Sequence, residues 1–219
     1  MKITKKMKDN YCFERYSFGI LIAIELLMSF TSLGYIHISP ISVTIAYLPI
    51  LVAGCLFGPI QSLIISCIFG IASMYKASAY YVMPSDAVFS PFLSGAPVSS
   101  IFLSIGTRAL FGFFIGMAFL FAEKRKHYRI WIGVLSAIAP KIHSLIVYTT
   151  MGILFPQLGY HYYSAFRWNL NNTIFALICV ITVELLWAIY QSDTIQNIKS
   201  YINQSVNNPY SSPKMNVLF

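Results

Sequence analysis

SVTIAYLPILVAGCLFGPIQSLIISCIFGIASMYK, residues 42–76, carries no charged side chain before its last residue, Lys76. As one α-helix the uncharged part would be about 51 Å long at ~1.5 Å per residue, against a bilayer hydrocarbon core of about 30 Å. Gly58 and Pro59 form a natural break near the middle, because glycine permits a tight turn and proline removes a backbone donor. The stretch therefore predicts two membrane-spanning helices joined by a short turn, with Pro49 kinking the first.

The composition of the whole chain indicates that its solvent is lipid. Of its 219 residues, 57% are hydrophobic and 10% are charged, whereas a soluble domain has about 25% charged residues. Unpaired backbone groups cost several kcal/mol each inside a membrane, which excludes a loop-rich fold. The apolar runs are continuous, whereas the strands of a membrane β-barrel alternate apolar and polar residues. These features predict an all-α integral membrane protein.

Hydropathy divides the chain into three parts. Residues 1–16 are predicted to be a basic N-terminal segment, residues 17–190 a membrane domain, and residues 191–219, rich in Asn, Ser and Pro, a flexible cytoplasmic tail. We predict six transmembrane helices in the membrane domain, at residues 17–35, 41–57, 60–75, 99–121, 130–154 and 169–190.

The positions of the basic residues predict the orientation of these helices. The net charge is +8, with 15 Lys and Arg in total. With six spans most of them fall on one side, before the first span, in the loop EKRKHYR (residues 123–129) and in the tail. Because cytoplasmic loops are enriched in Lys and Arg, both termini are predicted to be cytoplasmic. The basic charge is thus a topology signal, and we expect no nucleic-acid partner.

Four ionisable residues fall within the predicted spans: Glu25, Arg108, Lys141 and Glu184. A charge near the membrane centre costs a few kcal/mol or more, so each is a candidate functional residue. Glu25 could instead form an internal salt bridge with Arg108 or Lys141. One acid cannot neutralise two bases, however, so the remaining base could bind an anionic ligand group.

Further candidate substrate-binding residues are polar or aromatic. His143 lies two residues after Lys141, and Asn169 and Asn172 share a helix face through their three-residue spacing. An Asn here could also cap a helix. Trp168, Tyr160, Tyr162 and Tyr163 could stack on a flat ligand, although aromatic residues also anchor proteins at the membrane interface. Tyr81 is a further candidate substrate-binding residue.

Pairs of small residues four apart let helix backbones approach closely. They occur at Gly54/Gly58, Ser66/Gly70 and Gly112/Gly116, where packing inside the bundle is expected, and at Gly19/Ala23, which could face a partner. No metal-protease, nucleophile-elbow or phosphate-loop motif is present, so we expect neither an enzyme nor a bound cofactor or metal.

The pattern from LPILVAG through LFGP to FGIAS, followed by FSPF and TRALFGFFIGMAF, resembles the substrate-binding S components of energy-coupling factor (ECF) vitamin transporters, in the pantothenate, cobalamin and folate-like branch. The resemblance extends over most of residues 17–190. It implies a six-helix subunit that captures a vitamin or related micronutrient from outside.

The resemblance also implies partners: a membrane coupling T component and two cytoplasmic ATPases. S components contact the T component through small residues on the first helix, which correspond here to Gly19 and Ala23, with glycine in place of the usual first alanine. The fifth helix often carries an Asn in this branch, whereas this chain has Lys141 and His143. The alternatives are a membrane sensor domain, which the polar end of the chain disfavours, and a small membrane enzyme, which lacks a recognisable nucleophile and base.

Overall fold

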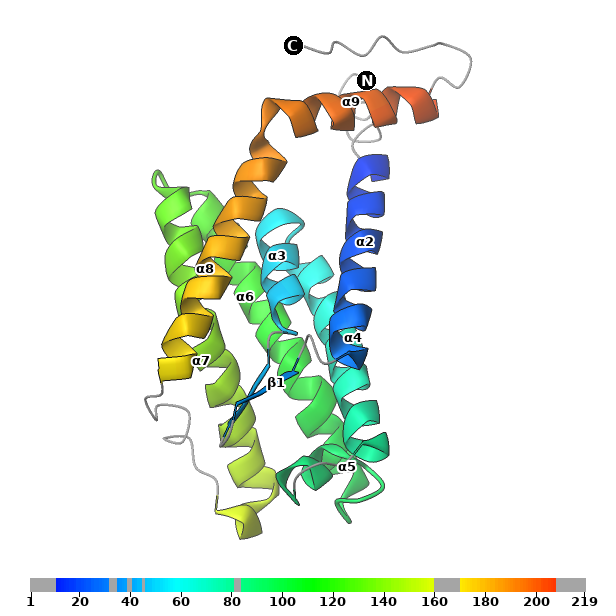
Figure 1. Ribbon diagram of the computed structural model, residues 1–219, viewed down its shortest axis with the longest axis vertical. Helices are drawn as coiled ribbons and strands as arrows, with labels where there is room; N and C mark the ends of the chain where they lie inside the picture. The colour runs from blue at the N-terminus through cyan, green and yellow to red at the C-terminus, as the bar shows by residue number, and fades with distance from the viewer. Residues whose placement is uncertain are drawn as a thin grey trace.

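The computed structural model describes residues 11–31, 35–38, 41–44, 46–80, 84–159 and 170–207. Long helices pack side by side into a bundle, two short paired strands follow the first helix in the chain, and one helix lies across an end (Figure 1). The elements are, in chain order, α2 (Tyr11–Phe30), β1 (Tyr35–Ile38), β2 (Ile41–Thr44), α3 (Leu48–Leu56), α4 (Pro59–Ala79), η2 (Pro84–Phe89), α5 (Pro97–Ile101), η3 (Phe102–Gly106), α6 (Thr107–Glu123), α7 (Tyr128–Leu154), η4 (Pro156–Leu158), α8 (Leu170–Gln191) and α9 (Asp193–Asn207).

Four helical segments in the described parts of the chain are long and apolar enough to cross a membrane. They are Pro59–Ala79, Pro97–Glu123, Tyr128–Leu154 and Thr173–Gln191. This confirms a helical protein with the character of a multi-pass membrane protein, with four such segments where the sequence predicted six spans. The first predicted span, α2, is 20 residues long but includes Glu14, Arg15 and Glu25.

The prediction of a second span at residues 41–57 was wrong for the first half of that segment. Residues 41–44 form strand β2, which pairs antiparallel with β1 from Tyr35↔Thr44 to Ile38↔Ile41. Their β-branched side chains favour a strand as much as a buried helix. Helix α3 has only 9 residues, or about 14 Å at ~1.5 Å per residue, roughly half of the hydrocarbon core. Pro49 lies in its first turn, so it starts this helix and does not kink it.

The turn predicted at Gly58 and Pro59 is confirmed. Gly58 has φ 99°, a value that favours glycine, and Pro59 is the first residue of α4. The hydroxyl of Ser62 donates a 3.1 Å hydrogen bond to the carbonyl of Ile50, which ties α4 back to α3. Ile50, Leu51 and other residues of α3 are fully buried, so this short helix lies in the core of the bundle.

The small residues of α3, α4 and α6 lie where these helices approach most closely. A Cβ atom on Gly54 would be 3.2 Å from the Cα of Gly116, and one on Gly112 would collide with the hydroxyl of Ser66. A Cβ atom on Gly70 would be 2.8 Å from the Cα of Ile105. The predicted packing role is therefore confirmed for Gly54, Gly70, Gly112 with Ser66, and Gly116, whereas Gly58 forms the turn before α4.

Helix α9 was not predicted, because we expected flexible chain from residue 191 onward. The segment is rich in Asn, Gln and Ser, and for this reason we overlooked that its isoleucines at 195, 198 and 202 recur with the spacing of an α-helix. The hydroxyl of Ser192 accepts a 3.4 Å hydrogen bond from the backbone N–H of Ile195, which caps the new helix.

Candidate functional site

A π-helical turn, η3, interrupts the helical segment between α5 and α6. The backbone N–H of Thr107 bonds to the carbonyl of Phe102, five residues earlier. Such a turn displaces backbone carbonyls from their usual partners. The hydroxyl of Thr107 donates to the carbonyl of Leu103 at 2.6 Å, and Nη1 of Arg108 donates to the carbonyls of Ser104 at 2.8 Å and of Leu103 at 3.4 Å. Two consecutive side chains of α6 therefore donate to two carbonyls of the π-turn, those of Leu103 and Ser104.

Arg108 is buried, with 7% of its surface exposed. Its Nη2 donates a 2.9 Å hydrogen bond to the hydroxyl of Ser73 on α4. The guanidinium lies 4.8 Å from the ring centroid of Phe69 and 5.4 Å from that of Phe89. Cation–π contacts of this kind stabilise a desolvated charge by about 2 kcal/mol. Carbonyls, a hydroxyl and two aromatic rings thus hold this cation inside the bundle.

His143 on α7 is the centre of an aromatic cluster with rings from α4, from α6 and from Tyr47, the residue before α3. Its ring is stacked on Tyr47, with ring centroids 5.7 Å apart, meets Phe111 edge-on at 5.1 Å and lies 6.4 Å from Phe69. Its Nε2 atom is buried and forms no hydrogen bond within the described structure. Because Phe69 also contacts Arg108, the residues form a continuous group, Phe89, Arg108, Phe69, His143 and Tyr47, which we call the mid-bundle stack.

Glu25 adds a buried acid to this region. Its side chain is fully buried on α2, and Oε1 accepts a 2.8 Å hydrogen bond from the hydroxyl of Ser29 one turn later. Its Oε2 is buried and accepts no hydrogen bond from the residues that the structure describes. Arg108 lies close enough for an electrostatic interaction with this carboxylate. An acid, a cation and an imidazole are therefore buried together in a bundle that is otherwise mostly apolar.

Of the predicted substrate-binding residues, the structure brings Arg108 and His143 together. Lys141 lies two residues before His143 on α7 and is partly exposed. Tyr81, Trp168 and Asn169 lie outside the described residues, as does the side chain of Asn172 in the first turn of α8. The carboxylate of Glu184 packs against Gly133 on α7. A Cβ atom added to Gly133 would lie 2.7 Å from Oε1 of Glu184.

The small residues predicted to contact a partner lie on an open side of α2. Gly19 and Ala23 are both exposed, and no atom would lie within 4 Å of a Cβ atom on Gly19. Their neighbours Ile20, Ile24 and Leu27 are exposed as well. This side of α2 is therefore available to lipid or to another protein.

Sequence reasoning missed the partners of these residues. Ser73, Tyr47 and the phenylalanines of the stack looked like ordinary core residues of apolar spans, and only the spacing of Glu25 and Ser29, four apart, was a visible signal. In the described parts of the chain no group of three or more His, Cys, Asp and Glu side chains could hold a metal ion.

Comparison with known proteins adds no family assignment. No protein-family model matches the chain. No curated protein matches it either.

Proposed function

We propose that this chain is a membrane-embedded binding protein for a small molecule, acting as the S component of an ECF-type importer for a vitamin or related micronutrient. The observation that carries the proposal is the mid-bundle stack with Glu25 beside it. Charged side chains inside a membrane cost a few kcal/mol or more and mark binding or transport pathways. The resemblance of residues 17–190 to S components gives the class of ligand.

The proposed arrangement has both termini in the cytoplasm. The start of α2, the α6–α7 connection and α9 lie at the same end of the bundle (Figure 1), and the exposed Arg15, Lys124 and Arg125 belong to that end. An excess of basic residues at one end supports a cytoplasmic location for it. In this arrangement α2 and α3 complete the six spans, with α3 crossing only part of the membrane.

An anionic ligand remains part of the proposal, and the contacts of Arg108 bear on how it would bind. The guanidinium already donates to Ser104, Leu103 and Ser73. Lys141, the second base within the predicted spans, is partly exposed on α7, and we assign it the contact with a ligand carboxylate or phosphate. The aromatic rings of Tyr47 and His143 provide flat surfaces for the remainder of the ligand.

The proposal is tested by identifying what the protein binds. The full chain is purified from cells grown in rich medium, and molecules released on denaturation are identified by mass spectrometry. A panel of vitamins is then screened by thermal shift. We expect a stabilising anionic vitamin whose binding Lys141→Gln weakens at least tenfold, while the control Lys76→Gln near the end of α4 leaves it unchanged. Exclusively neutral or cationic ligands, or equal affinities of the two variants, would contradict an anionic ligand bound by Lys141.

A further inference from the structure

Helix α9 runs across the end of the bundle, whereas the other long helices run along it (Figure 1). The change of direction occurs at Ser192, the single residue between α8 and α9. The backbone N–H of Ser192 donates to the carbonyl of Ile189 at 3.0 Å, and its hydroxyl donates to the same carbonyl at 2.7 Å. Together with the cap on Ile195, these bonds define the geometry of the corner.

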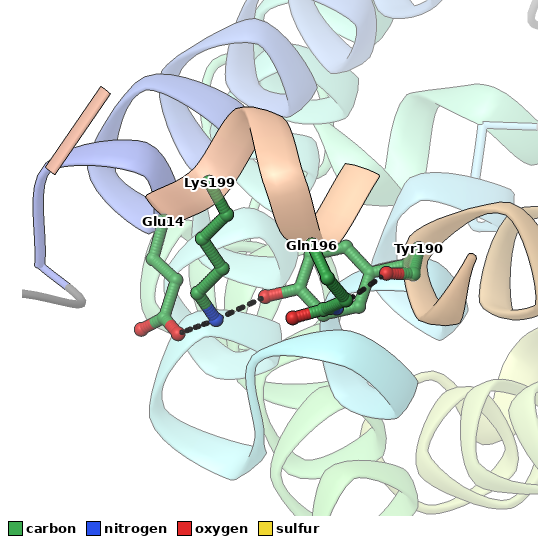
Figure 2. A network of polar contacts seen from close by, with 4 residues as sticks. All are labelled: Glu14, Tyr190, Gln196 and Lys199. Carbon is green, nitrogen blue, oxygen red and sulfur yellow. Dashed lines mark hydrogen bonds and ion pairs between the residues drawn. The ribbon is translucent and has the colours of Figure 1, made fainter. Parts of the chain in front are cut away.

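One side of α9 is apolar and faces the bundle. Ile195, Ile198 and Ile202 follow at spacings of three and four, and Asn197 lies on the opposite side. Lys199 is on the apolar side, and its Nζ lies 2.9 Å from Oε1 of Glu14 at the start of α2 (Figure 2). This contact shows which side of α9 is turned toward the other helices.

The neighbouring helices cover that apolar side only in part. Ile195 and Ile202 are partly buried, whereas Ile198 keeps 38% of its surface exposed. An amphipathic helix with an incompletely covered apolar side, placed at the end of membrane-spanning helices, has the geometry of a helix lying in the membrane interface.

The same end of the bundle carries a cluster of exposed bases in the α6–α7 connection and the first turn of α7: Lys124, Arg125, Lys126 and Arg129. Within this part of the chain the only acid is Glu123. Each Lys or Arg near an anionic membrane surface contributes about 1 kcal/mol of binding. The charge of this connection is therefore complementary to anionic phospholipid.

We propose that α9 is an interfacial helix that lies in the headgroup layer of an anionic leaflet, with its isoleucines toward the acyl chains. The bases of the α6–α7 connection bind anionic headgroups in the same layer. The contact between Glu14 and Lys199 links the start of α2 to this helix, so α9 fixes the depth of α2 in the membrane. This proposal depends on membrane embedding and is independent of the vitamin proposed above.

The position of α9 is tested with nitroxide labels on the full chain, with its native cysteines replaced by serine. Labels at Ile198→Cys and at the matched control Asn197→Cys are compared in nanodiscs of phosphatidylcholine and phosphatidylglycerol in equal parts. We expect the label at residue 198 to be more accessible to oxygen than to a water-soluble nickel chelate, and the label at 197 to show the reverse. Equal nickel accessibility at both positions would overturn the interfacial placement.

The choice of anionic lipid is tested by native mass spectrometry of lipids retained from the same mixture. We expect phosphatidylglycerol to be enriched over phosphatidylcholine. Lys126→Gln should lower that enrichment about fivefold, the factor equivalent to ~1 kcal/mol for one base. The control Lys76→Gln, near the C-terminal end of α4, should leave the enrichment of phosphatidylglycerol unchanged. An enrichment that is absent, or that is unaffected by Lys126→Gln, would overturn the role of anionic lipid.

Discussion

A methyl group on Gly116 of α6 would lie 2.6 Å from the Cα atom of Pro59, the first residue of α4. Side-chain carbon atoms do not approach backbone that closely, and backbone cannot move aside as the end of a flexible side chain can. The contact therefore places α6 directly on the turn between α3 and α4 and determines how closely these three helices pack.

Gly116→Ala is expected to destabilise the protein by about 1–3 kcal/mol, the usual cost of overpacking a core, although alanine is the better helix former. Thermal unfolding in detergent measures this effect. The matched control is Gly19→Ala, where a Cβ atom would meet nothing within 4 Å. If both variants unfold at the temperature of the parent protein, the helices do not pack as closely as described.

Gly19→Leu and Ala23→Leu together are expected to leave folding and ligand binding intact, because both residues are exposed on α2. Uptake in cells that also produce the T component and the ATPases should be lost, because leucine would keep a partner helix from the α2 backbone. Val134→Leu, on an exposed side of α7, is the control. Normal uptake by the α2 variant would show that this side does not meet the coupling subunit.

The contact between Glu14 and Lys199 is expected to contribute a coupling energy of about 0.2–1 kcal/mol, since both side chains are partly exposed. A double-mutant cycle of Glu14→Gln and Lys199→Gln, followed by chemical unfolding, measures this energy. Hydrogen exchange of the α9 amides should rise in both single variants. Purely additive effects would show that the contact does not stabilise the joint between α2 and α9.

Above neutral pH, the coupling energy from the same cycle is expected to change only in the alkaline range. Burial lowers the pKa of Lys199, but hydrogen bonds and charge interactions with Glu14 and Tyr190 outweigh it and raise the pKa above its ordinary 10.5. Stabilisation from a raised pKa is complete below the unfolded-state pKa and is lost as the pH rises through the folded-state pKa. The coupling energy should thus stay constant from neutral pH to about pH 10 and fall above it. A fall that begins near neutral pH would contradict this assignment.

Arg108→Lys is expected to loosen the π-turn, because an ammonium group cannot reproduce the separate bonds of Nη1 and Nη2 to Ser104 and Ser73. Hydrogen bonds to charged groups contribute about 1.5–3 kcal/mol each, so a loss of about 2 kcal/mol in stability is expected. Hydrogen exchange at residues 102–107 should accelerate. Arg125→Lys, in the exposed connection, is the control. Unchanged exchange in Arg108→Lys would show that the π-turn does not need this side chain.

How far the sequence predicted the structure depended on the physical signal available in each segment. Helices α4 and α7 agree with the predicted spans within a few residues, because long apolar runs between charged or Gly-Pro breaks have few alternatives in lipid. The paired strands Tyr35–Ile38 and Ile41–Thr44 were missed, since a β-branched run has the same hydropathy in a strand as in a helix. The burial of Arg108 followed from its position within a span. Its acceptors did not, because no composition signal marks a π-turn.

The π-turn also defines the relative rotation of the two ends of one helix. One residue in an α-helix corresponds to about 100° of rotation. Ser100, before the turn, donates a 2.6 Å hydrogen bond to the hydroxyl of Ser94, and Arg108, after it, reaches Ser73. Deleting one residue between 102 and 106 would restore regular helical winding and turn one of these contacts away from its partner. The segment Pro97–Glu123 thus consists of two helical parts that differ in rotation about the helix axis. The extra residue of the π-turn lets Ser100 and Arg108 both reach their partners.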